Sequence, residues 1–227
     1  CLRFAADLGY EVEEETGTAL VRCREMLRNV AAERIQAELR KLLMGAGCVE
    51  VLRRWPELFW EFWPELKALK GMPQNSPYHC WDGWEHTLHA LSAAPPDLAV
   101  RLAVLLHDVG KPPCRSTDET GVDHFYGHES VGAELADGML RRLKFANAPR
   151  ERVVTLVDRH CLWFPPEERN IRRWLGRLGA ETFFQLLEVK WCDGRGQPEE
   201  VSLPRRGELD ALETKARAIL AQGECLT

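Results

Sequence analysis

The feature that most constrains this chain is an apolar run that ends in an adjacent imidazole and carboxylate. Residues Leu102–Leu106 are all apolar, and His107 and Asp108 follow them directly. Burying a charge without a partner is costly, whereas imidazole and carboxylate are both ligands for first-row divalent metals. Gly110 and two prolines then end the helix, so the two neighbouring side chains can turn toward one ion. A metal site at the end of a buried helix is therefore expected. If only His107 and Asp108 are considered, the alternative to a metal site is a core histidine beside an aspartate that caps the helix end.

Other polar residues occupy the same kind of position, where an apolar helix meets a turn. A helical bundle packs successive helix ends together, so residues far apart in the sequence can reach one point. Three or four ligands hold one ion, and six can hold two that lie about 3.5–4 Å apart. Ligands of these types do not distinguish Mn, Fe, Ni, Co, Mg or Zn. The residues expected to bind one or two divalent ions are His86, His107, Asp108, His128, His160 and Asp193.

Apolar residues spaced by three and four predict an all-α fold. The pattern predicts one helix from Thr16 to Val30, another from Ala32 to Gly45 and a last one over 208–222. Residues 115–123 are polar and show no periodicity, so they predict a loop, and no stretch shows strand alternation. The aromatic stretch Trp55–Pro64 is interpreted as a core joint between helices, and His79, His89 and His124 as structural or exposed residues.

Composition limits the classes of partner. The formal net charge of −5 excludes an overall basic field that would recruit nucleic acid. No apolar run reaches the roughly 18 residues of a membrane span, and no signal peptide pattern opens the chain. The eight cysteines contain no C-x-x-C pair, which indicates reduced thiols. A cytoplasmic protein without a membrane partner is expected, and the initial Cys1 indicates a piece of a longer chain. The oligomeric state stays open.

The order of these histidines and aspartates resembles the HD superfamily of metal-dependent phosphohydrolases. Further segments resemble one branch, the HD domain carried by bacterial CCA-adding tRNA nucleotidyltransferases of the poly(A) polymerase family. The resemblance covers nearly the whole chain. The matching segments are Leu2–Tyr10 with Thr16, Glu33–Leu39, Trp84–Thr87, Leu105–Pro112, His124–Glu129, and Arg172–Leu175 with Gly179.

The resemblance implies a division into three parts. Residues 1–77 resemble a neck or body of helices, 78–200 an HD phosphohydrolase domain, and 201–227 a C-terminal helix that leads toward a tRNA-contacting tail. The nucleotidyltransferase head of that family would precede Cys1. Nucleotidyl transfer is therefore not expected from this chain alone.

The activity implied by the resemblance is metal-dependent hydrolysis of phosphoesters. The substrates would be nucleotides or RNA ends, such as 2′,3′-cyclic phosphates, and tRNA is a further partner to consider. Asp108 would bridge two ions or orient the attacking water, and Lys111 would stabilise charge on the phosphoryl oxygens. Weaker candidates for holding the rest of the substrate are Arg115, Arg172 and Arg173.

Two other classes of function stay open at this point. The chain could serve as a non-catalytic tRNA-binding body of a CCA-adding enzyme, with a vestigial or structural metal site. It could also be a purely structural domain of a larger assembly. Salt-dependent tRNA binding without hydrolysis would favour the first of these two, and the second predicts neither activity nor RNA binding.

Overall fold

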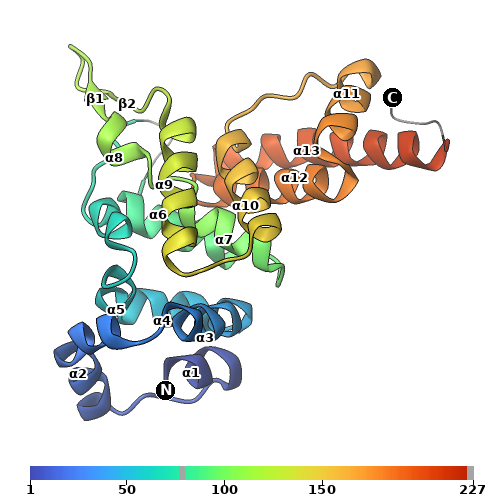
Figure 1. The fold of residues 1–227 in the computed structure, drawn as a ribbon. Helices are drawn as coiled ribbons and strands as arrows, with labels where there is room; N and C mark the ends of the chain where they lie inside the picture. The colour runs from blue at the N-terminus through green and yellow to red at the C-terminus, as the bar shows by residue number, and fades with distance from the viewer. Residues whose placement is uncertain (77–79, 224–227) are drawn as a thin grey trace.

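The computed structural model describes residues 1–76 and 80–223 as helices joined by loops, with one short hairpin (Figure 1). The all-α fold class is confirmed. The predicted boundary at 77/78 and His79 lie outside the described residues. The elements of the N-terminal part are α1 (Leu2–Leu8), α2 (Glu14–Arg22), η1 (Arg24–Asn29), α3 (Ala32–Met44), α4 (Cys48–Arg54), α5 (Pro56–Trp60) and η2 (Pro64–Leu69). The rest comprises α6 (Gly83–Ser92), α7 (Leu98–Leu106), α8 (Lys111–Cys114), β1 (Ser116–Thr117), β2 (Asp123–His124), α9 (His128–Arg142), α10 (Asn147–Arg159), α11 (Glu168–Leu178), α12 (Ala180–Arg195) and α13 (Glu199–Ala221).

Helix α7 is the central element of the C-terminal part. Every residue from Val100 to Leu106 is buried, and all of them except Arg101 are apolar, as expected for a helix inside a core. Helices α6, α10 and α12 pack around it, and α3 contacts it from the N-terminal part. Its start is fixed by Asp97, whose carboxylate accepts hydrogen bonds from the backbone N–H groups of Ala99 and Val100 at 2.8 and 3.1 Å. Because the start of α7 is capped and its sides are buried, the position of its last turn is fixed relative to the neighbouring helices.

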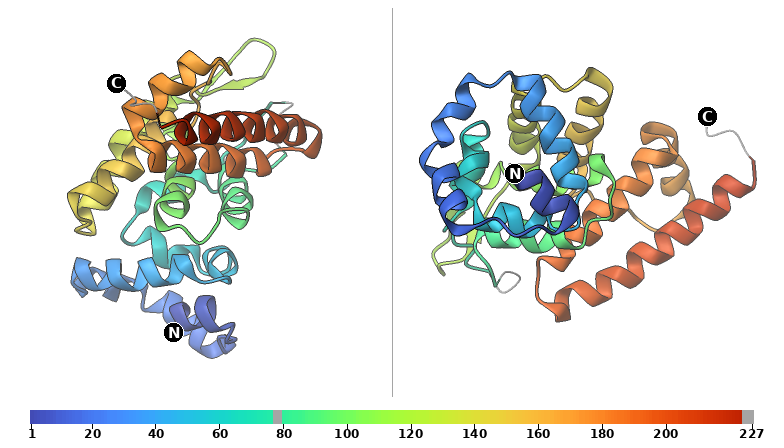
Figure 2. Two further views of the ribbon diagram at one scale, coloured as in Figure 1. Left: turned by 90° about the vertical axis from the view of Figure 1, so that its right-hand side faces the viewer. Right: turned by 90° about the horizontal axis from the view of Figure 1, so that it is seen from below.

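The N-terminal part packs below the C-terminal part, and α13 runs alongside α12 at the other end (Figures 1 and 2). The indole of Trp63, which is fully buried, donates a hydrogen bond to the Met139 carbonyl at 2.9 Å and joins η2 to α9. The aromatic stretch is therefore a joint between helices. Within the described residues, no helix has both the length and the apolar character needed to cross a membrane.

Three local predictions differ from the structure. The expected helix from Thr16 to Val30 is divided into α2 and the 3₁₀ helix η1. A spacing of three residues fits both helix types, so periodicity does not reveal the change. The predicted loop 115–123 contains the hairpin β1–β2, whose two-residue strands are too short to alternate. Helix α13 starts at Glu199 rather than 208 and contains Pro204.

A buried arginine connects the two parts of the molecule. The Arg101 guanidinium, on α7, donates hydrogen bonds to the carbonyls of Leu43 and Gly45 at the end of α3. It also donates to the carbonyls of Ala94 and Pro95, at 3.2 and 2.9 Å. A cation at a helix C-terminus is stabilised by the carbonyls that lack partners within the helix.

Replacing Arg101 by alanine is expected to lower the free energy of unfolding by about 2–4 kcal/mol, because buried carbonyls lose their donor. Urea denaturation measures this loss. Arg40→Ala, which removes an exposed arginine from α3, is the control and should change stability by about 0.5 kcal/mol or less. Equal effects of the two substitutions would contradict a joining role for Arg101.

Candidate metal centre

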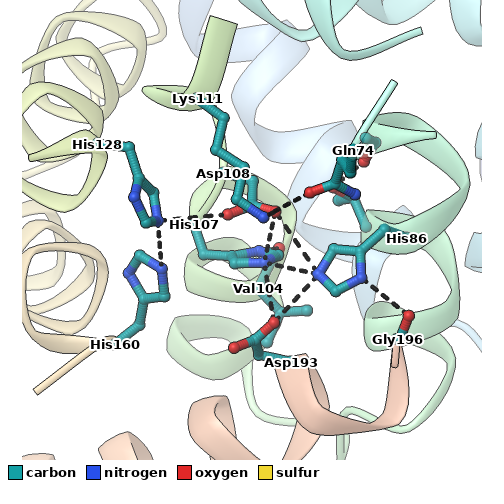
Figure 3. Close-up of polar contacts among 12 residues, drawn as sticks. Gln74, His86, Val104, His107, Asp108, Lys111, His128, His160, Asp193 and Gly196 are labelled. Atoms are coloured by element: carbon teal, nitrogen blue, oxygen red, sulfur yellow. Dashed lines mark hydrogen bonds and ion pairs between the residues drawn. The ribbon is translucent and has the colours of Figure 1, made fainter. Parts of the chain in front are cut away.

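The six predicted ligands lie together at one end of the helix bundle (Figure 3). Four of them, Asp108, His128, His160 and Asp193, line a cavity of about 580 Å³. The six ligands come from five places in the fold: the start of α6, the turn that ends α7, the start of α9, the end of α10, and the last turn of α12. Helix α7 ends at Leu106, so His107 and Asp108 lie in the terminating turn where both can face one point.

The four histidines share one arrangement. In each ring Nδ1 faces a backbone carbonyl, and because a carbonyl can only accept, Nδ1 carries the proton. Each Nε2 therefore presents its lone pair to the cluster when the ring is neutral. The hydrogen bond from Nδ1 to the carbonyl is the kind of contact that holds a metal-binding imidazole in orientation. The carbonyl partners are Gly196 for His86 at 2.9 Å, Val104 for His107 at 2.7 Å, Phe125 for His128 at 2.7 Å, and Val157 for His160 at 2.6 Å.

The first donor set contains His86, His107, Asp108 and Asp193. The two Nε2 atoms lie 3.3 Å apart. The Asp193 carboxylate is 3.1 Å from Nε2 of His86 and 3.6 Å from Nε2 of His107. Oδ2 of Asp108 lies 3.5 and 3.2 Å from the same two atoms. These separations are those of ligands around a common ion.

The second donor set contains His128, His160 and Cys161. The two Nε2 atoms are 3.2 Å apart. The Cys161 Sγ lies 3.2 Å from Nε2 of His160 and 3.7 Å from Nε2 of His128. Oδ1 of Asp108 is 3.7 Å from Nε2 of His128. One oxygen of Asp108 therefore faces each set, which matches the bridging position considered for this residue.

The charges of the cluster favour a cation. Burial lowers the pKa of His107, but the carboxylates of Asp108 and Asp193 raise it to about 10. Burial raises the pKa of those two carboxyl groups, yet the facing imidazoles hold both well below their usual value. Burial and the charge of His107 lower the pKa of His160 to about 3. The two carboxylates thus stabilise positive charge at this position, which favours binding of a divalent ion. The residues present therefore fit a metal.

Lys111 lies beside this cluster and lines the cavity. Its side chain is buried, and its ammonium group lies 2.7 Å from Oδ2 of Asp108 and donates to Oε1 of Gln74 at 2.7 Å. Sequence patterns did not indicate Gln74, which belongs to a loop without periodicity. Cys161 was also missed, because no C-x-x-C spacing accompanies it; its position next to His160 was the available signal.

The three predicted substrate-binding arginines lie elsewhere. Arg115 pairs with Asp123 at 3.1 Å, Arg172 bonds to Glu168, and the guanidinium of Arg173 lies 5.7 Å from the ring centroid of Trp174. Among the described residues that line the cavity, none of these three arginines appears. The basic residues that do line it are Lys111, Lys190 and Arg205.

Two glycines allow the close approach of helix ends that the cluster needs. A Cβ on Gly110 would lie 2.1 Å from the carbonyl oxygen of His128. A Cβ on Gly196 would lie 2.5 Å from Nδ1 of His86. The backbone at Gly196 is in the right-handed helical region, so the space beside His86, and not backbone strain, is what requires glycine there.

Gly196→Ala is therefore expected to rotate the His86 ring and weaken binding of Co²⁺ or Mn²⁺ about 10–100-fold, the usual cost of losing an orienting contact. Isothermal titration calorimetry measures the affinity. Gly194→Ala is a matched control, because its Cβ would meet no described atom within 4 Å. Unchanged affinity in Gly196→Ala would show that His86 takes no part in binding.

Comparisons with known proteins match two separate regions of the chain, and the candidate metal centre lies in the second of them. Residues 79–206 match the HD domain family, and residues 9–59 match the family described as the probable RNA- and SrmB-binding site of polymerase A. The chain is 38% identical to the CC-adding tRNA nucleotidyltransferase of Thermus thermophilus over 191 residues, which are 78% of this chain and 43% of that protein.

Two further relatives have similar identity. The A-adding tRNA nucleotidyltransferase of Deinococcus radiodurans is 34% identical over 239 residues, covering 97% of this chain and 54% of that protein. The multifunctional CCA protein of Neisseria gonorrhoeae is 34% identical over 209 residues, covering 87% and 47%. The chain thus spans about half the length of these curated relatives. It belongs to the HD-domain family, in the form that follows a poly(A) polymerase-type RNA-binding neck in tRNA nucleotidyltransferases.

Proposed function

We propose that this chain is a metal-dependent phosphohydrolase that acts on nucleotide or RNA-end phosphoesters, such as 2′,3′-cyclic phosphates. The observation that carries the proposal is the position of Asp108, whose two oxygens face two sets of imidazoles at the wall of an open cavity. A purely structural ion site would be closed to substrate, whereas a catalytic site keeps an open position.

The first donor set and His128 with His160 would hold one or two divalent ions. Such ions supply Lewis acidity toward a phosphoryl oxygen and activate water for attack. Asp108 keeps its charge because Lys111 and the imidazoles face it, so it can hold the position of both ions or accept a proton from water. Lys111 uses two of its three N–H bonds on Asp108 and Gln74. The third would donate to the phosphoryl group.

The cavity wall supports a nucleotide as the substrate. Tyr126 and Trp163 line the cavity, and their side chains are 79% and 62% exposed, which is unusual for such large rings. Base–aromatic stacking stabilises bound nucleotides by about 1–3 kcal/mol per base. Arg205, on the opposite helix α13, donates one hydrogen bond to Gln197 at 2.9 Å and could pair with a second phosphate.

A second candidate function has its own support. The match of residues 9–59 to an RNA-binding family favours a tRNA-binding body. In that case the chain would bind tRNA with an affinity that falls as salt rises, and would hydrolyse nothing. The two candidates are compatible if the neck delivers an RNA end to the cavity.

Hydrolysis of a 2′,3′-cyclic nucleotide and of p-nitrophenyl phosphate is expected with one or more of Mn²⁺, Fe²⁺, Co²⁺, Ni²⁺, Mg²⁺ and Zn²⁺. His107→Ala and Asp108→Ala should each abolish turnover, because each removes a donor from the first set. His89→Ala is the control: this ring stacks on Trp81 and lies outside the cavity lining. Absence of turnover with every metal, alongside retained tRNA binding, would favour the second candidate.

Trp163→Ala is expected to raise KM for the cyclic nucleotide about 5–100-fold while kcat changes little, since stacking on a base contributes about 1–3 kcal/mol and does not act on the phosphorus centre. Steady-state kinetics measure both constants. Trp81→Ala removes an exposed tryptophan that does not line the cavity and should leave KM unchanged. A loss of kcat with constant KM would exclude a base-binding role for Trp163.

A further inference from the structure

Cys161 forms with His128 and His160 a cluster that the HD pattern of histidines and aspartates does not include. Nδ1 of both rings donates to a carbonyl, so when both rings are neutral the two Nε2 atoms face each other with lone pairs across 3.2 Å. The thiol can donate its one proton to only one of these two nitrogens. A hydrogen bond from Cys161 to His160 therefore leaves His128 unsatisfied, whereas a cation among the three atoms satisfies all of them.

The separations of the three donor atoms are those of a tetrahedral site. With metal–nitrogen bonds of about 2.05 Å and a metal–sulfur bond of about 2.3 Å, tetrahedral angles place two nitrogens about 3.3 Å apart and a nitrogen and sulfur about 3.6 Å apart. The observed values are 3.2 Å for the nitrogens and 3.2 and 3.7 Å for the sulfur. Oδ1 of Asp108, 3.7 Å from Nε2 of His128, faces this second set from the side of the first.

The two donor sets differ in chemical softness. The first set has two carboxylates beside its imidazoles, which suits harder ions such as Mn²⁺ and Fe²⁺ as well as Zn²⁺. The second has a sulfur atom, which favours thiophilic ions. Cys161 is exposed and is one of the residues that line the cavity, so an ion can reach it from solvent. Lys190 donates to the His160 carbonyl at 2.6 Å and holds the turn that carries the thiol.

We propose that Cys161 is a thiolate ligand which, with His128 and His160, forms a second metal site selective for Zn²⁺ or Co²⁺. On binding, the sulfur–metal bond forms and the thiol proton leaves to bulk water. The proposal rests on the metal binding assumed in the proposed function, but it does not require turnover. It predicts that the two ions of this centre are chemically unlike.

Titration of the metal-free chain with Co²⁺ tests the proposal, because thiolate-to-Co²⁺ charge transfer absorbs in the near ultraviolet and imidazole or carboxylate ligands do not produce this band. The wild type should develop the band. Cys161→Ser should lose it, whereas Cys114→Ser, at a half-buried thiol outside the cavity, should keep it. His86→Ala breaks only the first set and should also keep it.

Alkylation gives a measurement that needs no variant. Burial raises the pKa of the Cys161 thiol to about 12, so iodoacetamide should modify it slowly in the metal-free chain. Zn²⁺ should block that slow modification while leaving the exposed Cys23 reactive. Co²⁺ binding without a charge-transfer band, a band that survives Cys161→Ser, or equal alkylation with and without Zn²⁺ would each overturn the proposal. A band without phosphoester turnover would retain the thiolate site and reject the hydrolase function, so the two failures are distinguishable.

Discussion

Four imidazole rings direct their Nε2 atoms into one small volume between two buried carboxylates. The candidate metal centre depends on a positive charge in that volume. Each ring is held by a hydrogen bond from Nδ1 to a carbonyl, at 2.6–2.9 Å. When the rings are neutral, the paired lone pairs at 3.2 and 3.3 Å repel each other, and the buried carboxylates repel as well. A cation converts these repulsions into attraction, and the ring orientations are already set for it.

This orientation is a product of helix packing. Helix α7 is buried on all sides and starts at the Asp97 cap, so its last turn cannot shift without disturbing the core. Arg101 connects the same helix to the end of α3 in the N-terminal part. Gly110 and Gly196 let neighbouring chain segments approach more closely than any side chain would allow. Helix α7 therefore contributes both to the metal centre, through the turn at its end, and to the joint between the two parts of the chain, through Arg101.

The structure also relates the two family matches to each other. The neck-like region packs on the side of α7 that carries Arg101, while the cavity opens at the other end of that helix. Aromatic and basic side chains border the cavity, as a nucleotide site requires. Under the proposed function, an RNA bound by the neck-like region and a phosphoester bound at the metal centre would therefore contact different surfaces of the chain. The first donor set contains carboxylates and the second contains a thiol, so the two sets would favour different metal ions.

Sequence patterns alone predicted the all-α class and the six residues that the structure places around one point, whereas the family came from the resemblance of whole segments. These predictions rest on local properties: apolar spacing reports a helix, and a polar residue after an apolar run reports its end. The short hairpin and the 3₁₀ segment η1 were missed because two-residue strands and three-residue spacing leave no distinct pattern. Which donors face each other, the inclusion of Cys161, and the pairing of Lys111 with Gln74 were decided only in three dimensions. Donor chemistry belongs to each residue by itself, whereas the distances between donors depend on how separate helices pack.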